Sequence, residues 1–183
     1  SLMSVCSAIH KKGISIAIGG VHVTNDIDNV LRTIPEVSFG FLKEADISIR
    51  NFCKVVNKTL DIKELRQVYI STDKQVIKFK ATSTPYHEDL DVIPAYDLMN
   101  TSELSTYGVM GNFYGFKPTN TKFSTVLSNR GCRAQCTFCS VRNFNGMGVR
   151  QRSVSSVLEE IDILYHEYGV RHIVWLDDDL LKD

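Results

Sequence analysis

Three cysteines lie close together in the C-terminal third of the chain, in the pattern Cys132-x3-Cys136-x2-Cys139. Thiolates are preferred ligands of soft metals and iron–sulfur clusters, so this spacing predicts a metal or redox site. A closed zinc site takes four ligands, a ferredoxin-type run supplies a fourth nearby cysteine, and a redox dithiol would leave Cys132 unused. Three thiolates on a four-iron cluster leave one iron without a protein ligand, where a substrate or cofactor can bind.

The other two cysteines, Cys6 and Cys53, stand on apolar helix faces, and we expect both to be core residues. The chain of 183 residues is 43% hydrophobic, with 21 Lys and Arg against 21 Asp and Glu. This zero balance argues against a nucleic-acid-binding surface, and no apolar run approaches the ~18 residues of a membrane span. The first residues lack the features of a signal peptide. We therefore expect a cytoplasmic protein with no membrane span and no nucleic-acid partner.

The first 80 residues alternate between helical and strand patterns, which is typical of an α/β fold. Helices are expected over residues 2–9, 26–31 and 46–60, strands over 14–18 and 36–41, and a hairpin over 66–71 and 75–80. Gly19 and Gly20 follow the first strand directly. The apolar face of the third helix is expected to carry Ile49, Phe52, Cys53, Val56 and Leu60.

Residues 81–121 are polar and turn-rich and hold three of the four prolines, so they are expected to connect two units. A strand pattern follows over 122–128, then the cysteine loop, a helix capped by Ser153, and a strand over 171–176. This order predicts one parallel, right-handed βαβ unit. The cysteine loop then follows the carboxyl end of a strand, where α/β folds and barrels place their sites.

The segment from Ser128 to Cys139 resembles the cluster loop of radical S-adenosylmethionine (SAM) enzymes, in its cysteine spacing and in the aromatic Phe138. The similarity continues through 150–153, Glu159-Glu160-Ile161 and 173–178, into the subgroup that carries an N-terminal cobalamin-binding domain. Residues 18–23 and 39–46 are similar to the two glycine turns of that domain, and 89–98 to the linker that follows it.

The resemblance implies three parts. Residues 1–80 would be the C-terminal part of a doubly wound, Rossmann-like cobalamin-binding domain, and 81–121 the interdomain linker. Residues 122–183 would form the first βαβ unit of a partial TIM-type radical SAM barrel. Both domains are smaller than their full folds, so we expect a segment truncated at both ends and inactive when isolated.

The resemblance also implies roles for individual residues. Cys132, Cys136 and Cys139 would hold a 4Fe-4S cluster whose open iron binds SAM, and the parent enzyme would cleave SAM to a 5′-deoxyadenosyl radical. Phe138 would lie along the adenine. Asp177 and Asp178 would bind the amino group of SAM, or one of them would cap a helix N-terminus. Gly19, Gly20 and His22 would border cobalamin. Arg150 and Arg152 are expected to be solvated loop charges rather than ligands of a carboxylate or phosphate.

Some positions depart from the subgroup. Arg133 stands where a proline is usual after the first cysteine, and no Asp-x-His-x2-Gly cobalamin-ligand motif is present. The expected reaction of the parent is cobalamin-dependent methyl transfer or ring formation on a small molecule, with flavodoxin or ferredoxin as electron donor. Two alternatives stay open: a non-catalytic zinc module completed by His166 or His172, and a radical SAM methylthiotransferase, which would carry three further cluster cysteines in its N-terminal half.

Overall fold

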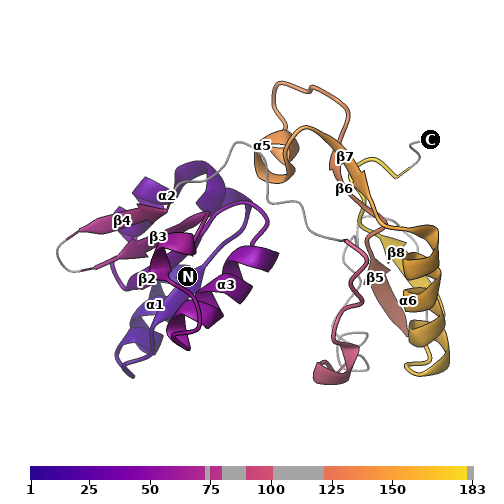
Figure 1. Cartoon of the computed structure of the whole chain (residues 1–183), viewed down its shortest axis with the longest axis horizontal. Helices are drawn as coiled ribbons and strands as arrows, with labels where there is room; N and C mark the ends of the chain where they lie inside the picture. The colour runs from indigo at the N-terminus through magenta and orange to yellow at the C-terminus, as the bar shows by residue number, and fades with distance from the viewer. Residues whose placement is uncertain (73–74, 80–89, 101–121, 181–183) are drawn as a thin grey trace. The chain divides into compact units, whose positions relative to one another are not determined.

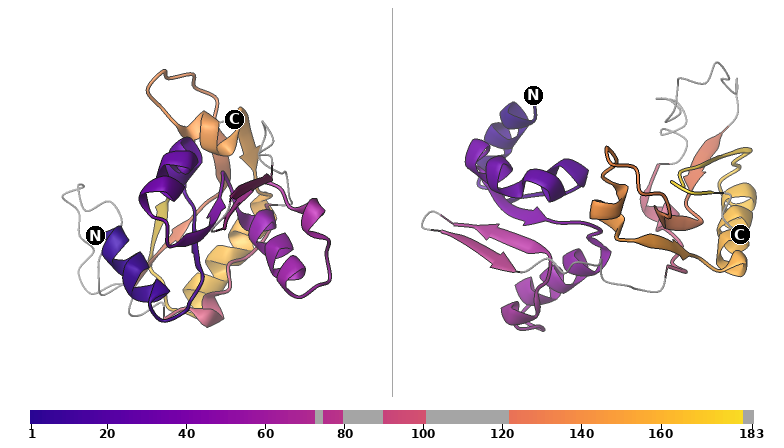
Figure 2. Two further views of the ribbon diagram at one scale, coloured as in Figure 1. Left: turned by 90° about the vertical axis from the view of Figure 1, so that its left-hand side faces the viewer. Right: turned by 90° about the horizontal axis from the view of Figure 1, so that it is seen from above.

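The computed structural model describes residues 1–72, 75–79, 90–100 and 122–180. The chain divides into two compact units (Figures 1 and 2). The first comprises Ser1–Glu88 with Ala134–Met147, and the second comprises Asp89–Arg133 with Gly148–Asp183. Both are mixed α/β structures, as the alternating patterns predict.

The sheet of the first unit has the strand order β1-β2-β3-β4. Its strands are β1 (Ile16–Ile18), β2 (Val37–Phe41), β3 (Val68–Ser71) and β4 (Val76–Phe79). The pair β1–β2 is parallel, and the two pairs that follow are antiparallel. The helices are α1 (Leu2–His10), α2 (Val21–Thr33), α3 (Asp46–Val56) and the short 3-10 helix η1 (Ile62–Glu64). The predicted hairpin is confirmed, although Lys80 lies outside the described residues.

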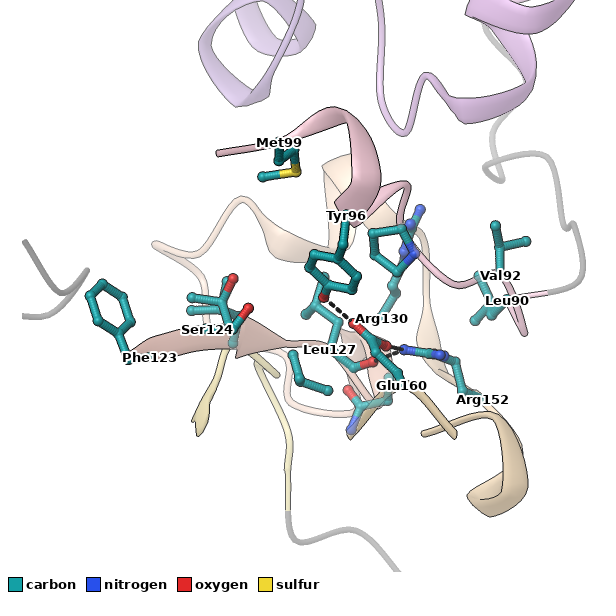
Figure 3. A pocket seen from close by; sticks show the side chains of 15 residues that line it. Leu90, Val92, Tyr96, Met99, Phe123, Ser124, Leu127, Arg130, Arg152 and Glu160 are labelled. Carbon is teal, nitrogen blue, oxygen red and sulfur yellow. Dashed lines mark hydrogen bonds and ion pairs between the residues drawn. The ribbon is translucent and has the colours of Figure 1, made fainter. Parts of the chain in front are cut away.

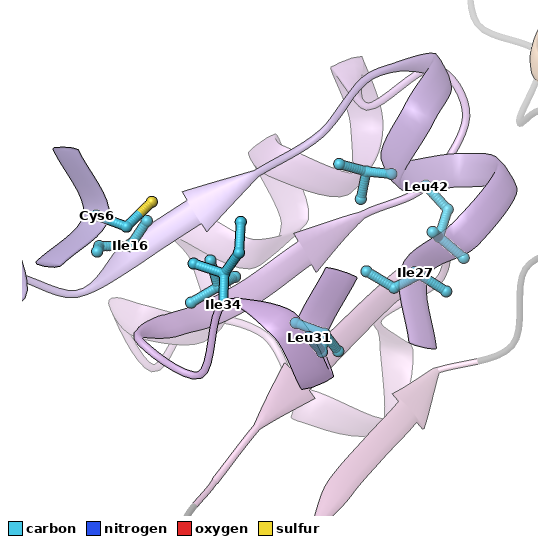
Figure 4. Close-up of a cluster of buried hydrophobic side chains, with 8 residues drawn as sticks. Cys6, Ile16, Ile27, Leu31, Ile34 and Leu42 are labelled. Atoms are coloured by element: carbon cyan, nitrogen blue, oxygen red, sulfur yellow. The ribbon is translucent and has the colours of Figure 1, made fainter. Parts of the chain in front are cut away.

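Helix α2 is longer than predicted, because the expected start at Asp26 is an interior break. Asp26 has non-helical backbone angles of φ −144° and ψ 39°, so two short helices join there. The first begins directly after Gly20, which has φ 100° and stands at the N-cap position. Apolar residues of α2 and β1 pack into one core with Cys6, which is 2% exposed, so the expected role of Cys6 is confirmed (Figure 4).

The contact between α2 and β2 is close at Gly40, near the end of β2. A Cβ atom at Gly40 would lie 2.4 Å from Cδ1 of Ile27, which is 7% exposed. A side chain at this position would therefore require the buried Ile27 side chain to move.

The prediction for α3 was wrong about which face is buried. Cys53 is exposed, as are Ile49 (49%) and Val56 (62%), whereas Ile47 and Ser48 are buried. The ring of Phe52 packs on those of Phe39 and Phe41, with centroids 4.6 and 5.5 Å apart. The helix has apolar residues around most of its circumference, so contacts with β2 decide its orientation rather than periodicity.

The second unit contains the predicted βαβ arrangement. Strands β5 (Phe123–Val126) and β8 (His172–Trp175) pair in parallel and flank helix α6 (Val154–His166) in sequence. Ser153 caps α6 by accepting a hydrogen bond from the Ser156 amide at 3.1 Å, as predicted. The core of this unit gathers residues of the strands, the helix and the 3-10 helix η2 (Tyr96–Leu98): Tyr96, Val126, Val157, Leu164 and Val170.

The segment predicted to be a loop after β5 begins and ends as a strand. Strands β6 (Asn129–Cys132) and β7 (Gly148–Gln151) form an antiparallel hairpin in which Cys132 lies opposite Gly148. We call this pair the cysteine hairpin; its connecting segment contains α5 (Val141–Asn145). The two strands are polar and glycine-containing, so they lack the alternation that predicts a sheet.

Within the described residues, no helix has the length and apolar content needed to cross a membrane.

Candidate functional site

The three clustered cysteines lie at the end of β6 and in the segment after it. Cys132 is half-buried, Cys136 and Cys139 are exposed, and none of the three is in a disulfide in the described part of the chain. Phe138, between the last two, is 91% exposed, so its ring is available to a ligand. Thiolates are the ligands that hold iron–sulfur clusters, and this segment supplies three cysteines. Among the described residues, no three His, Cys, Asp or Glu side chains converge on one metal-ion position.

Residues 127–129 connect β5 to the cysteine hairpin, and we call them the root of the hairpin. Asp177 binds the backbone amides of this root. The Asp177 carboxylate accepts hydrogen bonds from the backbone amides of Ser128 (2.7 Å) and Asn129 (3.2 Å). It also accepts from the Ser128 hydroxyl and, at 3.1 Å, from the Asn129 side-chain amide. Four donors occupy this carboxylate, so its place at the end of β8 serves the root of the hairpin.

Arg152 holds the carbonyl side of the same root. Its guanidinium donates to the Leu127 carbonyl oxygen at 3.0 Å, and its backbone amide donates to the Ser128 carbonyl oxygen at 2.9 Å. It also bonds the Ser156 hydroxyl at 2.8 Å and forms an ion pair with Glu160. The Arg152 side chain is only 7% exposed. The expectation of a solvated loop charge was therefore wrong, because the fold of the hairpin brings Arg152 against α6.

Glu160 contacts both Arg152 and Tyr96, which lies in η2 before β5 (Figure 3). The Tyr96 hydroxyl donates to Glu160 Oε1 at 2.5 Å, and the Glu160 side chain is 2% exposed. Burial raises the pKa of Tyr96, and the hydrogen bond to Glu160 raises it further. A second hydrogen bond joins the residues before β5 to α6. The Asp91 carboxylate accepts it from the backbone amide of Ser153, at the start of the helix, at 2.7 Å.

The two aspartates that follow Asp177 differ from it. Burial raises the pKa of Asp178, and the neighbouring charge of Asp177 raises it further. Asp179 accepts from the Arg133 amide and pairs with the Arg133 guanidinium, both at 3.2 Å, beside Cys132. Residues 178–180 form turns, and residues 181–183 lie outside the described part of the chain, so the N-cap role of these aspartates stays a prediction.

A cavity of about 380 Å³ lies in the second unit, beside β5 (Figure 3). Its walls are mostly apolar and come from residues 90–99, from β5 and from Leu176. Arg152, Glu160 and Tyr96 are among the polar residues of its wall, with Asn129 and Arg130. The cavity therefore adjoins the residues that hold the root of the cysteine hairpin.

In the first unit, the predicted cobalamin candidates gather where β1 ends and α2 begins. Gly19 leaves no room for a larger side chain without contact, since a Cβ there would lie 3.4 Å from the Phe41 carbonyl oxygen. His22 is exposed in the first turn of α2. The Thr24 hydroxyl accepts from the Lys43 amide at 2.8 Å, which ties α2 to the turn after β2.

Helix α5, which follows the cysteines, belongs to the first unit. The Asn145 side-chain amide donates to Glu44 at 2.8 Å, and that of Asn143 donates to Asn25. Glu44 and Asn25 lie after β2 and in α2, the elements that carry the two glycine turns. The segment after the cysteines is thus hydrogen-bonded to the elements that carry the predicted cobalamin residues.

Sequence reasoning identified the cysteines but missed the residues that support them. Tyr96 and Glu160 are 64 positions apart, so no local pattern connects them. The sequence does contain a signal that Glu160 is buried. It lies three residues after Val157 and four before Leu164, on the buried face of α6. A carboxylate on such a face requires a partner, and Arg152 is the nearest cation in sequence.

No family model matches the chain. It is 26% identical over 167 residues to an uncharacterized methyltransferase of Pyrococcus horikoshii, covering 91% of this chain and 34% of that protein. It is 40% identical over 58 residues to the cytidylyl-2-hydroxyethylphosphonate methyltransferase of Streptomyces wedmorensis, covering 32% and 11% of the two chains. It is also 25% identical over 167 residues to the anaerobic magnesium-protoporphyrin IX monomethyl ester cyclase of Cereibacter sphaeroides, covering 88% and 25%. The chain therefore spans about a third or less of each relative.

Two solved structures share the fold. The cobalamin-dependent SAM radical enzyme OxsB, with aqua-cobalamin and SAM bound, matches 100% of this chain and 24% of its own, at 20% identity and TM-score 0.71. The radical SAM methyltransferase TsrM from Kitasatospora setae, with tryptophan and a SAM analogue bound, matches 96% and 32%, at 11% identity and TM-score 0.68. These matches confirm the predicted fold class, and the structural neighbours are members of the group that the sequence resembles.

Proposed function

We propose that this chain is the part of a cobalamin-dependent radical SAM enzyme that joins the cobalamin-binding domain to the start of the barrel. The observation that carries the proposal is the position of the cysteine motif. Cys132 ends a hairpin rooted at the carboxyl end of β5, in a parallel βαβ unit. Carboxyl ends of parallel strands are where barrels of this kind place their chemistry. The domain limits that we propose are residues 1–80, 81–121 and 122–183.

Cys132, Cys136 and Cys139 would hold a 4Fe-4S cluster as thiolates, one on each of three irons. When bound, such a cluster supplies the electron that cleaves SAM to a 5′-deoxyadenosyl radical. The exposed ring of Phe138 is free to stack on the adenine of SAM. The role of this chain is then to hold the thiolates in place and to bind the nucleoside.

Asp178 is the better candidate for the amino group of SAM. All four hydrogen bonds described for Asp177 go to the root of the hairpin, so that side chain positions the loop. Asp178 is adjacent to Asp177 and exposed, so a ligand can reach its carboxylate. Desolvation and the neighbouring charge of Asp177 raise its pKa, which reflects a carboxylate that lacks stabilising charge. An ammonium group beside it would stabilise the charged form through a charge-assisted hydrogen bond.

Gly19, Gly20 and His22 would border cobalamin at the end of β1. The positive φ of Gly20 and the absence of a side chain at Gly19 leave backbone accessible at the start of α2. A ligand can approach such a turn closely. We further propose methyl transfer or ring formation on a small molecule, an electron donor of the flavodoxin or ferredoxin type, a cytoplasmic location, and no turnover by this segment alone.

The test is anaerobic reconstitution of the chain with iron and sulfide, followed by metal analysis. The proposal predicts about four iron and four sulfide per chain. Cys132→Ala, Cys136→Ala and Cys139→Ala should each lose most of this content, whereas Cys53→Ala, at an exposed cysteine of the first unit, should retain it. Stoichiometric zinc without sulfide, lost on changing His166 or His172, would instead identify a structural zinc module.

A further inference from the structure

The residues before the barrel strand reach the root of the cysteine hairpin through buried hydrogen bonds in the second unit. Tyr96 donates to Glu160, Glu160 pairs with Arg152, and Arg152 donates to the Leu127 carbonyl oxygen. The backbone amide of Arg152 donates to the Ser128 carbonyl oxygen. Figure 3 shows Tyr96, Glu160 and Arg152 meeting beside Leu127. This series ends four or five residues before Cys132.

We propose that Tyr96, Glu160 and Arg152 are positioning residues that fix the direction in which β6, and with it Cys132, leaves β5. The inference rests on the proposed function, since it assigns these residues to the placement of a cluster ligand. We name the three residues the buried relay. The contacts of the relay with Leu127 and Ser128 are the route by which it acts on Cys132.

The root is held on both sides by charged groups, which is why it can have one orientation. The Arg152 guanidinium donates to the Leu127 carbonyl oxygen, and its backbone amide donates to that of Ser128. The Asp177 carboxylate accepts from the backbone amides of Ser128 and Asn129. Arginine presents several donors in a rigid, planar fork, so the guanidinium that bonds Leu127 is itself oriented by Glu160 and Ser156. Glu160 would be an isolated buried charge without these partners.

Tyr96 brings the linker into this arrangement. It lies in η2, and its ring packs on Tyr168 with centroids 5.7 Å apart. Its hydroxyl is the group that contacts Glu160, so ring packing and relay contact can be separated by substitution. Tyr96→Phe removes the hydrogen bond and keeps the ring.

The experiment compares three variants of the full-length protein. Arg152→Lys keeps a cation for Glu160 but loses the fork, and Tyr96→Phe loses the hydroxyl. Val170→Ala is the control, because Val170 is 3% exposed in the same core and follows α6 at the end away from the root. Two readouts are used: amide hydrogen exchange of residues 127–132 without metal, and the SAM concentration needed to shift the electron paramagnetic resonance spectrum of the reduced cluster.

Arg152→Lys and Tyr96→Phe should raise exchange in residues 127–132 and the half-saturating SAM concentration, each about ten-fold, with iron content retained. Val170→Ala should change neither, although its melting temperature falls. Wild-type exchange and SAM concentrations in both relay variants would overturn the inference and leave the proposed function standing. Equal changes in Val170→Ala would do the same. A wild-type protein that takes up no iron and sulfide would overturn the proposed function and, with it, the assignment to a cluster.

Discussion

Replacing Glu160 by glutamine should destabilise the second unit strongly. The substitution keeps the shape of the side chain and a hydrogen-bond acceptor for Tyr96, but it leaves the Arg152 guanidinium buried without a counter-charge. The two side chains are 7% and 2% exposed. Removing one partner of such a pair costs about 3–5 kcal/mol, against 0–1 kcal/mol for an exposed pair.

The expected loss is a large part of the free energy of unfolding of the second unit. A domain is stable by about 5–15 kcal/mol, so 3–5 kcal/mol is a substantial share. The second unit falls in the range of about 60–100 residues, for which each kcal/mol lowers the melting temperature by about 4–8 °C, so a fall of roughly 12–40 °C is expected. The chain's single tryptophan, Trp175 in β8, reports unfolding of this unit by fluorescence.

A double-mutant cycle gives the sharper measurement. Arg152→Met should cost about as much as Glu160→Gln, because it leaves the carboxylate buried and unpaired. The double variant should cost about as much as either single change, since the second removes a group that the first has already left unpaired. Urea titration followed at Trp175 gives all four free energies of unfolding. A cost below about 1 kcal/mol for Glu160→Gln, or single costs that simply add, would refute a buried coupled pair.

Three further predictions concern other parts of the structure. Asp177→Asn should destabilise the second unit by about 1.5–3 kcal/mol in urea titrations, because an amide nitrogen would face donors of the hairpin root, and Asp178→Asn should cost less; equal costs would contradict the distinction between them. Tyr96 has a pKa raised above its ordinary value of 10.0, so its neutral form is favoured in the folded state and its contribution is complete below that pH. The contribution is lost as pH rises beyond 10, and Tyr96→Phe should flatten the alkaline fall in stability; a parallel curve for the variant would count against the assignment. Gly40→Ala should destabilise the first unit by about 1–3 kcal/mol, because its methyl group would press on Ile27. Far-ultraviolet circular dichroism should then be lost at a lower urea concentration, with the Trp175 transition unchanged. Unchanged stability would mean that α2 can shift freely.

The features that sequence predicted correctly are those with a local signal. The β5–α6–β8 unit follows from a capped amphipathic helix between two apolar runs. The role of the three cysteines rests on their spacing and stays a prediction. The buried face of α3 was not predictable in this way, because Ile47, Ile49 and Phe52 offer more than one apolar face. Contacts of Phe52 with β2 made the choice.

The supporting part of the site depends on contacts between distant residues. The cysteine hairpin pairs Cys132 with Gly148 through strands without hydrophobic alternation. Arg152 reads as a loop charge in sequence and becomes buried only because that hairpin folds back on α6. Glu160, which pairs with Arg152, accepts its other hydrogen bond from Tyr96, 64 positions earlier in the chain. Such pairs are set by the tertiary fold, and single-residue preferences do not encode them.

The central claim is that the three clustered cysteines hold a 4Fe-4S cluster with an iron open to SAM. The most direct measurement is the electron paramagnetic resonance spectrum of the anaerobically reconstituted, reduced chain, recorded without and with SAM. We predict a spectrum typical of a reduced 4Fe-4S cluster that changes on addition of SAM. A cluster spectrum that SAM leaves unchanged, or no cluster spectrum after reconstitution, would contradict the account.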